Sequence, residues 1–270
     1  MTLRAALKDF VPPAILRTAR RFSGSGIRFE GNFLTWRDAQ LASAGYAHEE
    51  IVRRVYEAEC KVRNGEAADE RDSVLFESVQ FSLPVMAALA RIACMRNGNF
   101  RVLDFGGAFG GMYRQYRAFG LPGHVSWNVV EQADFVRLGR SFETSELRFF
   151  TSLEEVLAGG LPNLVLLSSV IQYLENPMEI LRKITSTGVS HIVIDRTPCF
   201  DAEYDLLTVQ RVPSEIYKAS YPCWIFSRPS LLQVLEKDYR MVAAFTDSAS
   251  PWHGPGVKFD LAGFMLDRKT

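Results

Sequence analysis

The chain has 270 residues, of which 47% are hydrophobic and 23% charged, a composition typical of a folded globular protein rather than a disordered one. Equal numbers of basic and acidic residues give a formal net charge of zero, so no overall field favours nucleic acid as a partner. No apolar run approaches the ~20 residues needed to cross a bilayer, and the four cysteines and four histidines lack the close spacing of zinc ligands. We therefore expect a cytoplasmic protein with no metal site and no nucleic-acid partner.

Residues 1–27 form a basic N-terminal arm in which apolar and basic side chains are interleaved. Two interpretations are open: the arm is solvated, or it makes weak contact with an anionic membrane surface, peripheral to the inner membrane. Two consecutive prolines interrupt the segment and weaken the membrane interpretation. The basic residues are Arg4, Lys8, Arg17, Arg20 and Arg21, against the single acid Asp9.

Helical patterns dominate residues 28–98, which we predict to be a helical N-terminal extension. Thr35, followed by Asp38, is typical of a helix start, and Gly45 is typical of a helix end. A second helix is expected over about 49–61.

A third helix is expected to begin at Asp72 and Ser73, which have the residue types of helix caps. Apolar residues follow at helical spacing of three to four positions as far as Ile92. The extension should therefore end in a long helix packed against the domain that follows.

From Phe100 onward, short apolar runs alternate with helical segments. Strands that alternate with helices of 10–15 residues predict βαβ units and a parallel sheet. The predicted strands are residues 101–103, 125–130, 147–150, 164–167 and 191–194.

The C-terminal part departs from this alternation. Two apolar runs, 241–245 and 261–266, follow a predicted helix over 229–236. The turn-rich segment between the runs is too short for a crossover helix, so the two strands should be antiparallel. We predict an α/β fold for residues 99–270: a Rossmann-like, seven-stranded, mostly parallel sheet with an antiparallel last strand, as in class I methyltransferases.

A glycine-rich turn follows the first predicted strand, with Asp104 before it and Gly106, Gly107 and Gly110 within it. Glycines allow the backbone to approach a nucleotide-like ligand closely. The run resembles the first motif of S-adenosylmethionine (SAM)-dependent methyltransferases, except that Ala108 replaces the usual middle glycine. The resemblance implies cofactor-binding roles for these residues.

The same turn also approximates the dinucleotide fingerprint G-x-G-x-x-G. A carboxylate at Asp104 would repel a pyrophosphate, whereas SAM offers an ammonium group there. This charge argument favours SAM over NAD as the cofactor.

Polar residues at the ends of the next strands extend the predicted cofactor site. Glu131 is placed to bind the ribose hydroxyls of either SAM or NAD, unless it is only an exposed carboxylate at a helix N-terminus. By resemblance to methyltransferases, Ser152 lies where the adenine is usually contacted. Ser169 is expected to line the cleft. Tyr173 stands where the family usually has histidine, and a phenol is a poor base at neutral pH.

Three titratable residues are candidates for a general base, namely Tyr173, Asp195 and His191, and none stands out. Arg196 is suited to hold an anionic group of the acceptor. Arg71, in the N-terminal extension, is expected to reach the carboxylate of the cofactor. An aromatic insertion at about 198–227 is expected to form a loop that acts as an acceptor lid, with Tyr221 and Trp224 as substrate-binding residues; the alternative is that these rings only pack the insertion onto the domain.

The chain as a whole resembles a bacterial family of class I SAM-dependent methyltransferases whose substrate is unassigned. Relatives often lie among genes for cell-surface polysaccharides, which implies a small-molecule or saccharide acceptor. The absence of an N-P-P-Y-type motif after the fourth strand mildly favours O-methylation. Two alternatives remain: an NAD(P)-dependent oxidoreductase, and a non-catalytic nucleoside-binding protein. The matching stretches are residues 31–36, 70–76, 103–107, 194–198 and 220–224.

Overall fold

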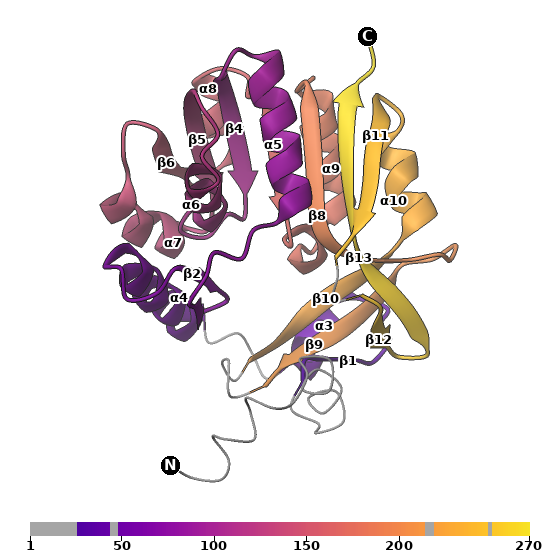
Figure 1. Ribbon diagram of the computed structural model, residues 1–270. Helices are drawn as coiled ribbons and strands as arrows, with labels where there is room; N and C mark the ends of the chain where they lie inside the picture. The colour runs from indigo at the N-terminus through magenta and orange to yellow at the C-terminus, as the bar shows by residue number, and fades with distance from the viewer. Residues whose placement is uncertain (1–25, 44–47, 214–218, 248–249) are drawn as a thin grey trace, which may run out of the picture.

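The computed structural model describes residues 26–43, 48–213, 219–247 and 250–270. Most of the basic N-terminal arm and Gly45 lie outside these ranges. A twisted central sheet forms the middle layer, and helices cover it on both faces (Figure 1).

The sheet has the predicted strand directions. Strands β6, β5, β4, β7 and β8 lie side by side in that order and are parallel. Strand β13 pairs antiparallel with β8, and β11 pairs antiparallel with β13. The Rossmann-like sheet with an antiparallel last strand is thus confirmed. The bounds are β4 (Asn99–Phe105), β5 (His124–Val130), β6 (Leu147–Phe150), β7 (Leu164–Ser168), β8 (His191–Phe200), β11 (Tyr239–Thr246) and β13 (Val257–Arg268).

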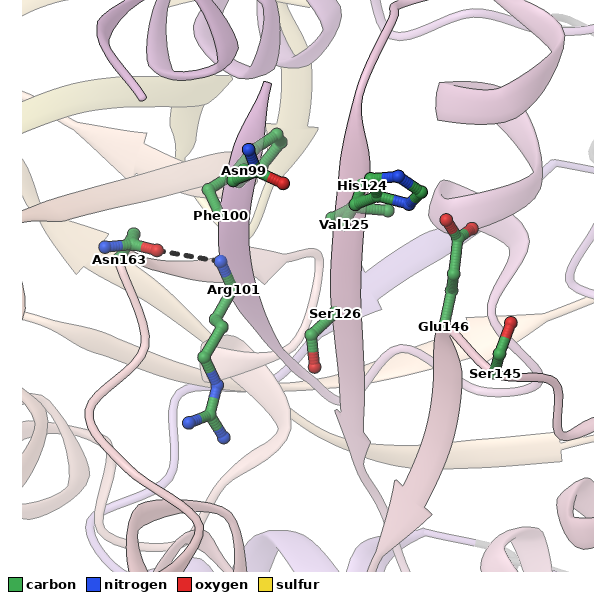
Figure 2. A pocket seen from close by; sticks show the side chains of 9 residues that line it. All are labelled: Asn99, Phe100, Arg101, His124, Val125, Ser126, Ser145, Glu146 and Asn163. Carbon is green, nitrogen blue, oxygen red and sulfur yellow. Dashed lines mark hydrogen bonds between the residues drawn. The ribbon is translucent and has the colours of Figure 1, made fainter. Parts of the chain in front are cut away.

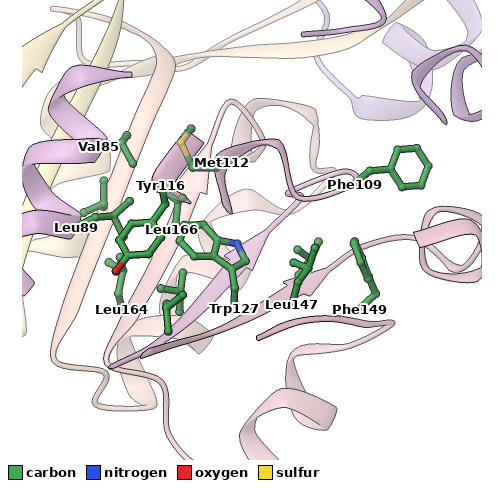
Figure 3. Close-up of a cluster of buried hydrophobic side chains, with 14 of the residues drawn as sticks. Val85, Leu89, Phe109, Met112, Tyr116, Trp127, Leu147, Phe149, Leu164 and Leu166 are labelled. Atoms are coloured by element: carbon green, nitrogen blue, oxygen red, sulfur yellow. The ribbon is translucent and has the colours of Figure 1, made fainter. Parts of the chain in front are cut away.

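The strands are buried on both faces because alternate side chains enter two separate cores. On β7, Leu164 and Leu166 belong to one core, whereas Val165 and Leu167 belong to the other. Figure 3 shows the first core, in which Trp127 packs among side chains of neighbouring strands and helices. The helices of the domain are α5 (Leu83–Met95), α6 (Gly111–Ala118), α7 (Ala133–Gly139), α8 (Leu153–Ala158), α9 (Pro177–Ser186) and α10 (Arg228–Leu235), with the 3₁₀ turns η1 (Arg140–Phe142) and η2 (Ile171–Tyr173).

Two helices of the N-terminal extension form as predicted. Thr35 caps α3 (Trp36–Ala42), and its Oγ1 accepts a hydrogen bond from the backbone N–H of Asp38 at 3.1 Å. The second helix, α4 (His48–Arg63), ends at the expected place.

The expected third helix was wrong at its start. Asp72 and Ser73 have φ values of 51° and 65°, in the left-handed region, and join β2 (Asp69–Arg71) to β3 (Val74–Phe76). Two consecutive left-handed residues form the turn of a two-residue hairpin and cannot start a helix. The helix α5 begins only after Ser82.

The aromatic insertion is a second correction, because it is mainly strand rather than loop. Strand β9 (Leu206–Val212) pairs antiparallel with β10 (Ala219–Ser227), and β1 (Arg28–Glu30) from the extension pairs with β9. The end of β10 then pairs with the end of β8. We call β1, β9 and β10 the platform; it projects beyond the end of the main sheet, and the short β12 (Trp252–Gly254) pairs with β13 nearby (Figure 1).

Among the described residues, no helix is both long enough and apolar enough to span a bilayer.

Candidate functional site

The predicted site residues gather where the parallel strands end. Because β4, β5, β7 and β8 are parallel, their carboxyl ends meet at one edge of the sheet, where open α/β sheets bind ligands. We call this the carboxyl edge, and the opposite edge the amino edge. Asp104, Glu131 and Ser169 lie at or just beyond the ends of β4, β5 and β7, and Asp195 lies on β8 beside the last residue of β7.

The glycine-rich turn after β4 is shaped by backbone conformations that favour glycine. Gly106 has a φ of 73°, and a Cβ there would lie 2.3 Å from Cγ2 of Val170. A Cβ on Gly107 would lie 2.5 Å from the carboxyl of Asp104. Ala108, in the place of the usual middle glycine, has a φ of 46° although it carries a Cβ. The turn is therefore tightly packed, and Gly110 leads into α6.

Asp104 lies beneath this turn rather than open to solvent. Its residue is 1% exposed, and its Oδ2 accepts a hydrogen bond from the indole N–H of Trp127 at 3.0 Å. Burial raises the pKa of Asp104 to about 7; the Trp127 hydrogen bond lowers it, and the nearby charge of Glu131 raises it further. The carboxyl of Asp104 therefore packs directly against Gly107 of the turn.

Glu131 is brought against the glycine turn, as its place at the end of β5 predicted. Its Oε1 accepts a hydrogen bond from the backbone N–H of Ala108 at 3.3 Å, and its Oε2 accepts one from Gln132 at 2.8 Å. Burial raises the pKa of Glu131, while these two hydrogen bonds lower it. Two carboxyl groups thus flank the turn.

Ser152 and Ser169 occupy different local environments. The Ser152 Oγ caps α8 by accepting a hydrogen bond from the backbone N–H of Glu155 at 3.3 Å. Ser169 has a left-handed φ of 54°, and its Oγ accepts a hydrogen bond from the side chain of Gln172 at 3.1 Å. Ser169 thus lies within the site, whereas the contact that the structure gives Ser152 is a helix cap.

Asp195 and Arg196 end the part of β8 that pairs with β7. Asp195 is 3% exposed, and its Oδ2 accepts hydrogen bonds from the hydroxyls of Ser168 at 2.9 Å and Ser82 at 3.3 Å. Arg196 has a φ of 50°, and its Nη2 donates to the Ser168 Oγ at 3.0 Å. The N-terminal extension thus contacts the site directly, through Ser82.

The aromatic side chains of the platform are held in place by hydrogen bonds. The Tyr173 hydroxyl donates a hydrogen bond to Gln210 Oε1 at 3.0 Å, and Gln210 Nε2 donates one to the Tyr221 hydroxyl at 3.4 Å. The Trp224 indole N–H donates to the Leu174 carbonyl at 3.1 Å. The insertion therefore does not form the loop-like lid expected from the sequence, and its rings sit on a paired sheet.

His191 does not join this site, which corrects its place among the base candidates. It begins β8, and its Nδ1 lies 2.7 Å from Oδ1 of Asp267, a buried neighbour on β13. Four residues of strand, roughly 13 Å, separate it from Asp195. Its role is to pair with Asp267 at the amino edge.

The pocket in Figure 2 also lies at the amino edge and not at the site. It has a volume of about 470 Å³ and is lined by residues from the starts of β4 and β5, among them Asn99, Arg101 and His124. The Asn163 side chain accepts a hydrogen bond from the backbone N–H of Arg101 at 2.8 Å. We assign no ligand to this pocket, because the predicted site residues lie elsewhere.

Sequence reasoning missed the contribution of the β2–β3 hairpin as a structure. Arg71 ends β2 and Asp72 begins the turn, and the charge of Arg196 influences the pKa of each. The residue types alone gave a helix cap, and only the left-handed backbone identifies the turn. In the described ranges, no three His, Cys, Asp or Glu side chains are grouped as metal ligands would be.

No protein-family model matches the sequence, and no curated protein matches it. Among solved structures, the N-terminal domain of EvdMO1, determined in the presence of SAH and D-fucose, is 16% identical and has a TM-score of 0.48, with 83% of this chain and 98% of that chain covered. The 1,6-didemethyltoxoflavin-N1-methyltransferase of Burkholderia thailandensis is 15% identical, with a TM-score of 0.45 and coverage of 84% and 92%. A SAM-dependent methyltransferase of Clostridium acetobutylicum is 9% identical, with a TM-score of 0.45 and coverage of 68% and 91%. The fold assignment rests on the strand order described above.

Proposed function

We propose that this chain binds SAM at the carboxyl edge and catalyses methyl transfer to a hydroxyl group of a small-molecule or saccharide acceptor. The observation that carries the proposal is the glycine turn flanked by two carboxyl groups, Asp104 beneath it and Glu131 beside it. The choice of a hydroxyl acceptor, the acceptor class and a cytoplasmic location are proposed from the sequence.

Charge favours SAM over a dinucleotide at this turn. Each of the two carboxyl groups has a raised pKa, Asp104 in part because of the charge on Glu131. A ligand with an ammonium and a sulfonium group would stabilise the ionised carboxylates, whereas a pyrophosphate would be repelled by them. The backbone N–H of Ala108, which a pyrophosphate would need, already donates to Glu131.

The chemistry of SAM determines what the protein has to do in the proposed reaction. SAM, when bound, supplies a methyl group on a positively charged sulfur, which an acceptor oxygen displaces in line. The chain has to align that oxygen, exclude water and receive the hydroxyl proton. The Tyr173 hydroxyl is protonated and donates a hydrogen bond to Gln210, and His191 lies at the amino edge. We therefore propose that Asp195 receives the proton of the acceptor hydroxyl.

The platform and the neighbouring η2 turn suit a hydroxyl-rich acceptor. Tyr173, Gln210 and Tyr221 present phenol, amide and ring surfaces, and the two tyrosine rings pack edge to face with centroids 5.2 Å apart. Amphipathic rings beside hydrogen-bonding groups suit the polar and apolar faces of a sugar. Trp224 and Arg196 are further proposed acceptor contacts.

Calorimetry with SAM, S-adenosylhomocysteine (SAH) and NAD tests the proposal. We expect SAM and SAH to bind, and Glu131→Gln to weaken SAH binding by at least about tenfold, because charge-assisted hydrogen bonds to the ribose are lost. Glu179→Gln, an exposed acid on α9, is the matched control and should bind SAH normally. Binding of NAD alone would favour an oxidoreductase, and binding of none of the three would favour a non-catalytic protein.

A further inference from the structure

The β2–β3 hairpin is fixed to the glycine turn by a buried charge network. Asp69 Oδ1 accepts a hydrogen bond from Arg114 Nη2 at 2.8 Å, and its Oδ2 accepts one from Gln115 Nε2 at 3.2 Å. Arg114 also pairs with Glu59 of α4. Asp69 and Glu59 are 1% and 0% exposed. Because Arg114 and Gln115 belong to α6, which begins where the glycine turn ends, the hairpin cannot move independently of the turn.

The segment after the hairpin connects it to the middle of β8, at Asp195. Gln115 Oε1 accepts a hydrogen bond from the backbone N–H of Ser82 at 3.1 Å, and the Ser82 hydroxyl donates to Asp195. Arg71 Nη2 donates to the carbonyl of Gln80, two residues before Ser82, at 3.2 Å. The guanidinium of Arg71 is thereby held near Arg196.

Two guanidinium groups from separate elements are therefore held on either side of the segment that contacts Asp195, near enough for their charges to interact. Burial lowers the pKa of Arg71, and the positive charge of Arg196 lowers it further. Arg196 donates one hydrogen bond, to Ser168, while its Nε is buried without a hydrogen-bond partner among the described residues and lies 3.4 Å from Asp195 Oδ2. Its left-handed backbone is a strained conformation of the kind that concentrates at functional sites. Guanidinium donors thus remain for a ligand.

The acidic side chains around Arg71 and Arg196 do not use up the guanidinium donors that remain for a ligand. Asp195 already accepts hydrogen bonds from two hydroxyl groups, those of Ser168 and Ser82. Asp72 is exposed to solvent, while desolvation by the surrounding protein raises its pKa against the lowering effect of Arg196 and Arg71. Asp247 and Asp69 also act on Arg71, and Asp69 is bonded to Arg114.

We propose that Arg71 and Arg196 together bind a carboxylate or phosphate group of a ligand, with Asp72 as the opposing charge at its side. Each guanidinium group presents parallel N–H donors that match two oxygens of such an anion. Under the proposed function, the anion is either the carboxylate of the cofactor or an acidic group of the acceptor. The first source would make this a zwitterion site, with Asp72 facing the ammonium; the second would make the acceptor an anionic compound.

Calorimetric titration with inorganic phosphate, on free and SAH-saturated protein, tests the site. We expect Arg71→Gln and Arg196→Gln each to weaken phosphate binding at least about fivefold. Asp72→Asn should strengthen it severalfold, because a competing negative charge is removed, and asparagine tolerates the left-handed backbone. Arg137→Gln, on an exposed pair of α7, is the matched control. Thermal unfolding of each variant checks that it is folded.

The SAH arm separates the two sources. If the acceptor supplies the anion, phosphate binds equally well with SAH present, and the variants keep the wild-type SAH affinity. If the cofactor supplies it, SAH displaces phosphate, and all three variants weaken SAH binding. The proposal is overturned if folded Arg71→Gln and Arg196→Gln bind both phosphate and SAH like the wild type. It is also overturned if the wild type does not bind phosphate and the two variants keep the wild-type SAH affinity. Wild type that binds phosphate but no SAH would instead overturn the proposed function and leave the anion site standing.

Discussion

The two edges of the same sheet handle buried charge in opposite ways. At the amino edge, Asp267 receives both guanidinium nitrogens of Arg91, at 3.0 and 2.7 Å, and lies 2.7 Å from His191. Although burial raises the pKa of Asp267, the hydrogen bonds from Arg91 and His191 hold it below its usual value. Its charge is stabilised within the protein.

At the carboxyl edge, the structure pairs neither Asp104 nor Glu131 with a cationic side chain among the described residues. Asp104 receives one indole hydrogen bond, and its pKa is raised. The backbone differs as well. Six non-glycine residues in the described part of the chain have a left-handed φ, and five of them lie at this edge or in the hairpin turn beside it: Asp72, Ser73, Ala108, Ser169 and Arg196. The sixth, Asn97, precedes β4. Carboxyl groups with a raised pKa and a strained backbone at one edge indicate a binding site, whereas the paired Arg91, Asp267 and His191 at the other indicate structural support.

The largest expected effect is a loss of stability at the amino edge. Asp267→Ala leaves Arg91 and His191 without their buried partner and should lower the free energy of unfolding by about 3 kcal/mol. Chemical denaturation measures this loss. SAH affinity of the folded variant should stay within about twofold of wild type, and a much weaker affinity would mean that the amino edge also serves the ligand. Asp267→Asn, which keeps the shape, should cost less.

The second prediction concerns how stability depends on pH through Asp104 at the carboxyl edge. The pKa of Asp104 is about 7 in the fold, above its unfolded value, so the folded state favours the protonated carboxyl. Stability from this group is full below about pH 4 and is lost as pH rises towards 7, by at most about 1.4 kcal/mol per pH unit. Asp104→Asn removes this loss and can still accept the Trp127 hydrogen bond. The variant should therefore gain stability relative to wild type between pH 5 and pH 8, measured by denaturation at both; an equal difference at the two pH values contradicts the raised pKa.

The third prediction separates packing from backbone conformation in the glycine turn. Gly106→Ala places a Cβ against Val170 at a left-handed φ, and we expect a loss of about 2 kcal/mol in stability and at least tenfold in SAH affinity. Gly65→Ala is the matched control, since Gly65 has a φ of 79° and no atom within 4 Å of the added Cβ. It should cost about 1 kcal/mol and leave SAH binding unchanged. Equal SAH affinities in the two variants would remove the turn from the site.

The sequence predicted the sheet well because strands buried on both faces leave a local signal. The run 164–167 is continuous and apolar, and each of its side chains enters one of the two cores. The glycine turn is equally local, because the conformations it needs are encoded by the residues that adopt them. Asp104 and Glu131 could be brought together in advance, since both end neighbouring parallel strands.

The errors came from features that local patterns do not encode. The helical spacing after Ser73 continues through β3, where a short apolar run fits either structure, and the left-handed turn decided the outcome. The platform depends on β1 pairing with β9, about 180 residues away in the chain. His191 and Asp195 are close in sequence, but a strand extends about 3.3 Å per residue and places them at different edges.

Ser152 gives the smallest prediction and tests where the binding edge ends. Its hydroxyl caps the six-residue helix α8, so Ser152→Ala should lower stability by about 1 kcal/mol, as measured by denaturation. Ser152→Asp keeps a capping oxygen and should restore that stability. If the cap is the whole role, both variants bind SAH like the wild type, because the backbone at the end of β6 is unchanged. If SAH affinity falls in the alanine variant and the capping aspartate does not restore it, the hydroxyl itself contacts the ligand, and the site extends from β4 and β5 to the end of β6.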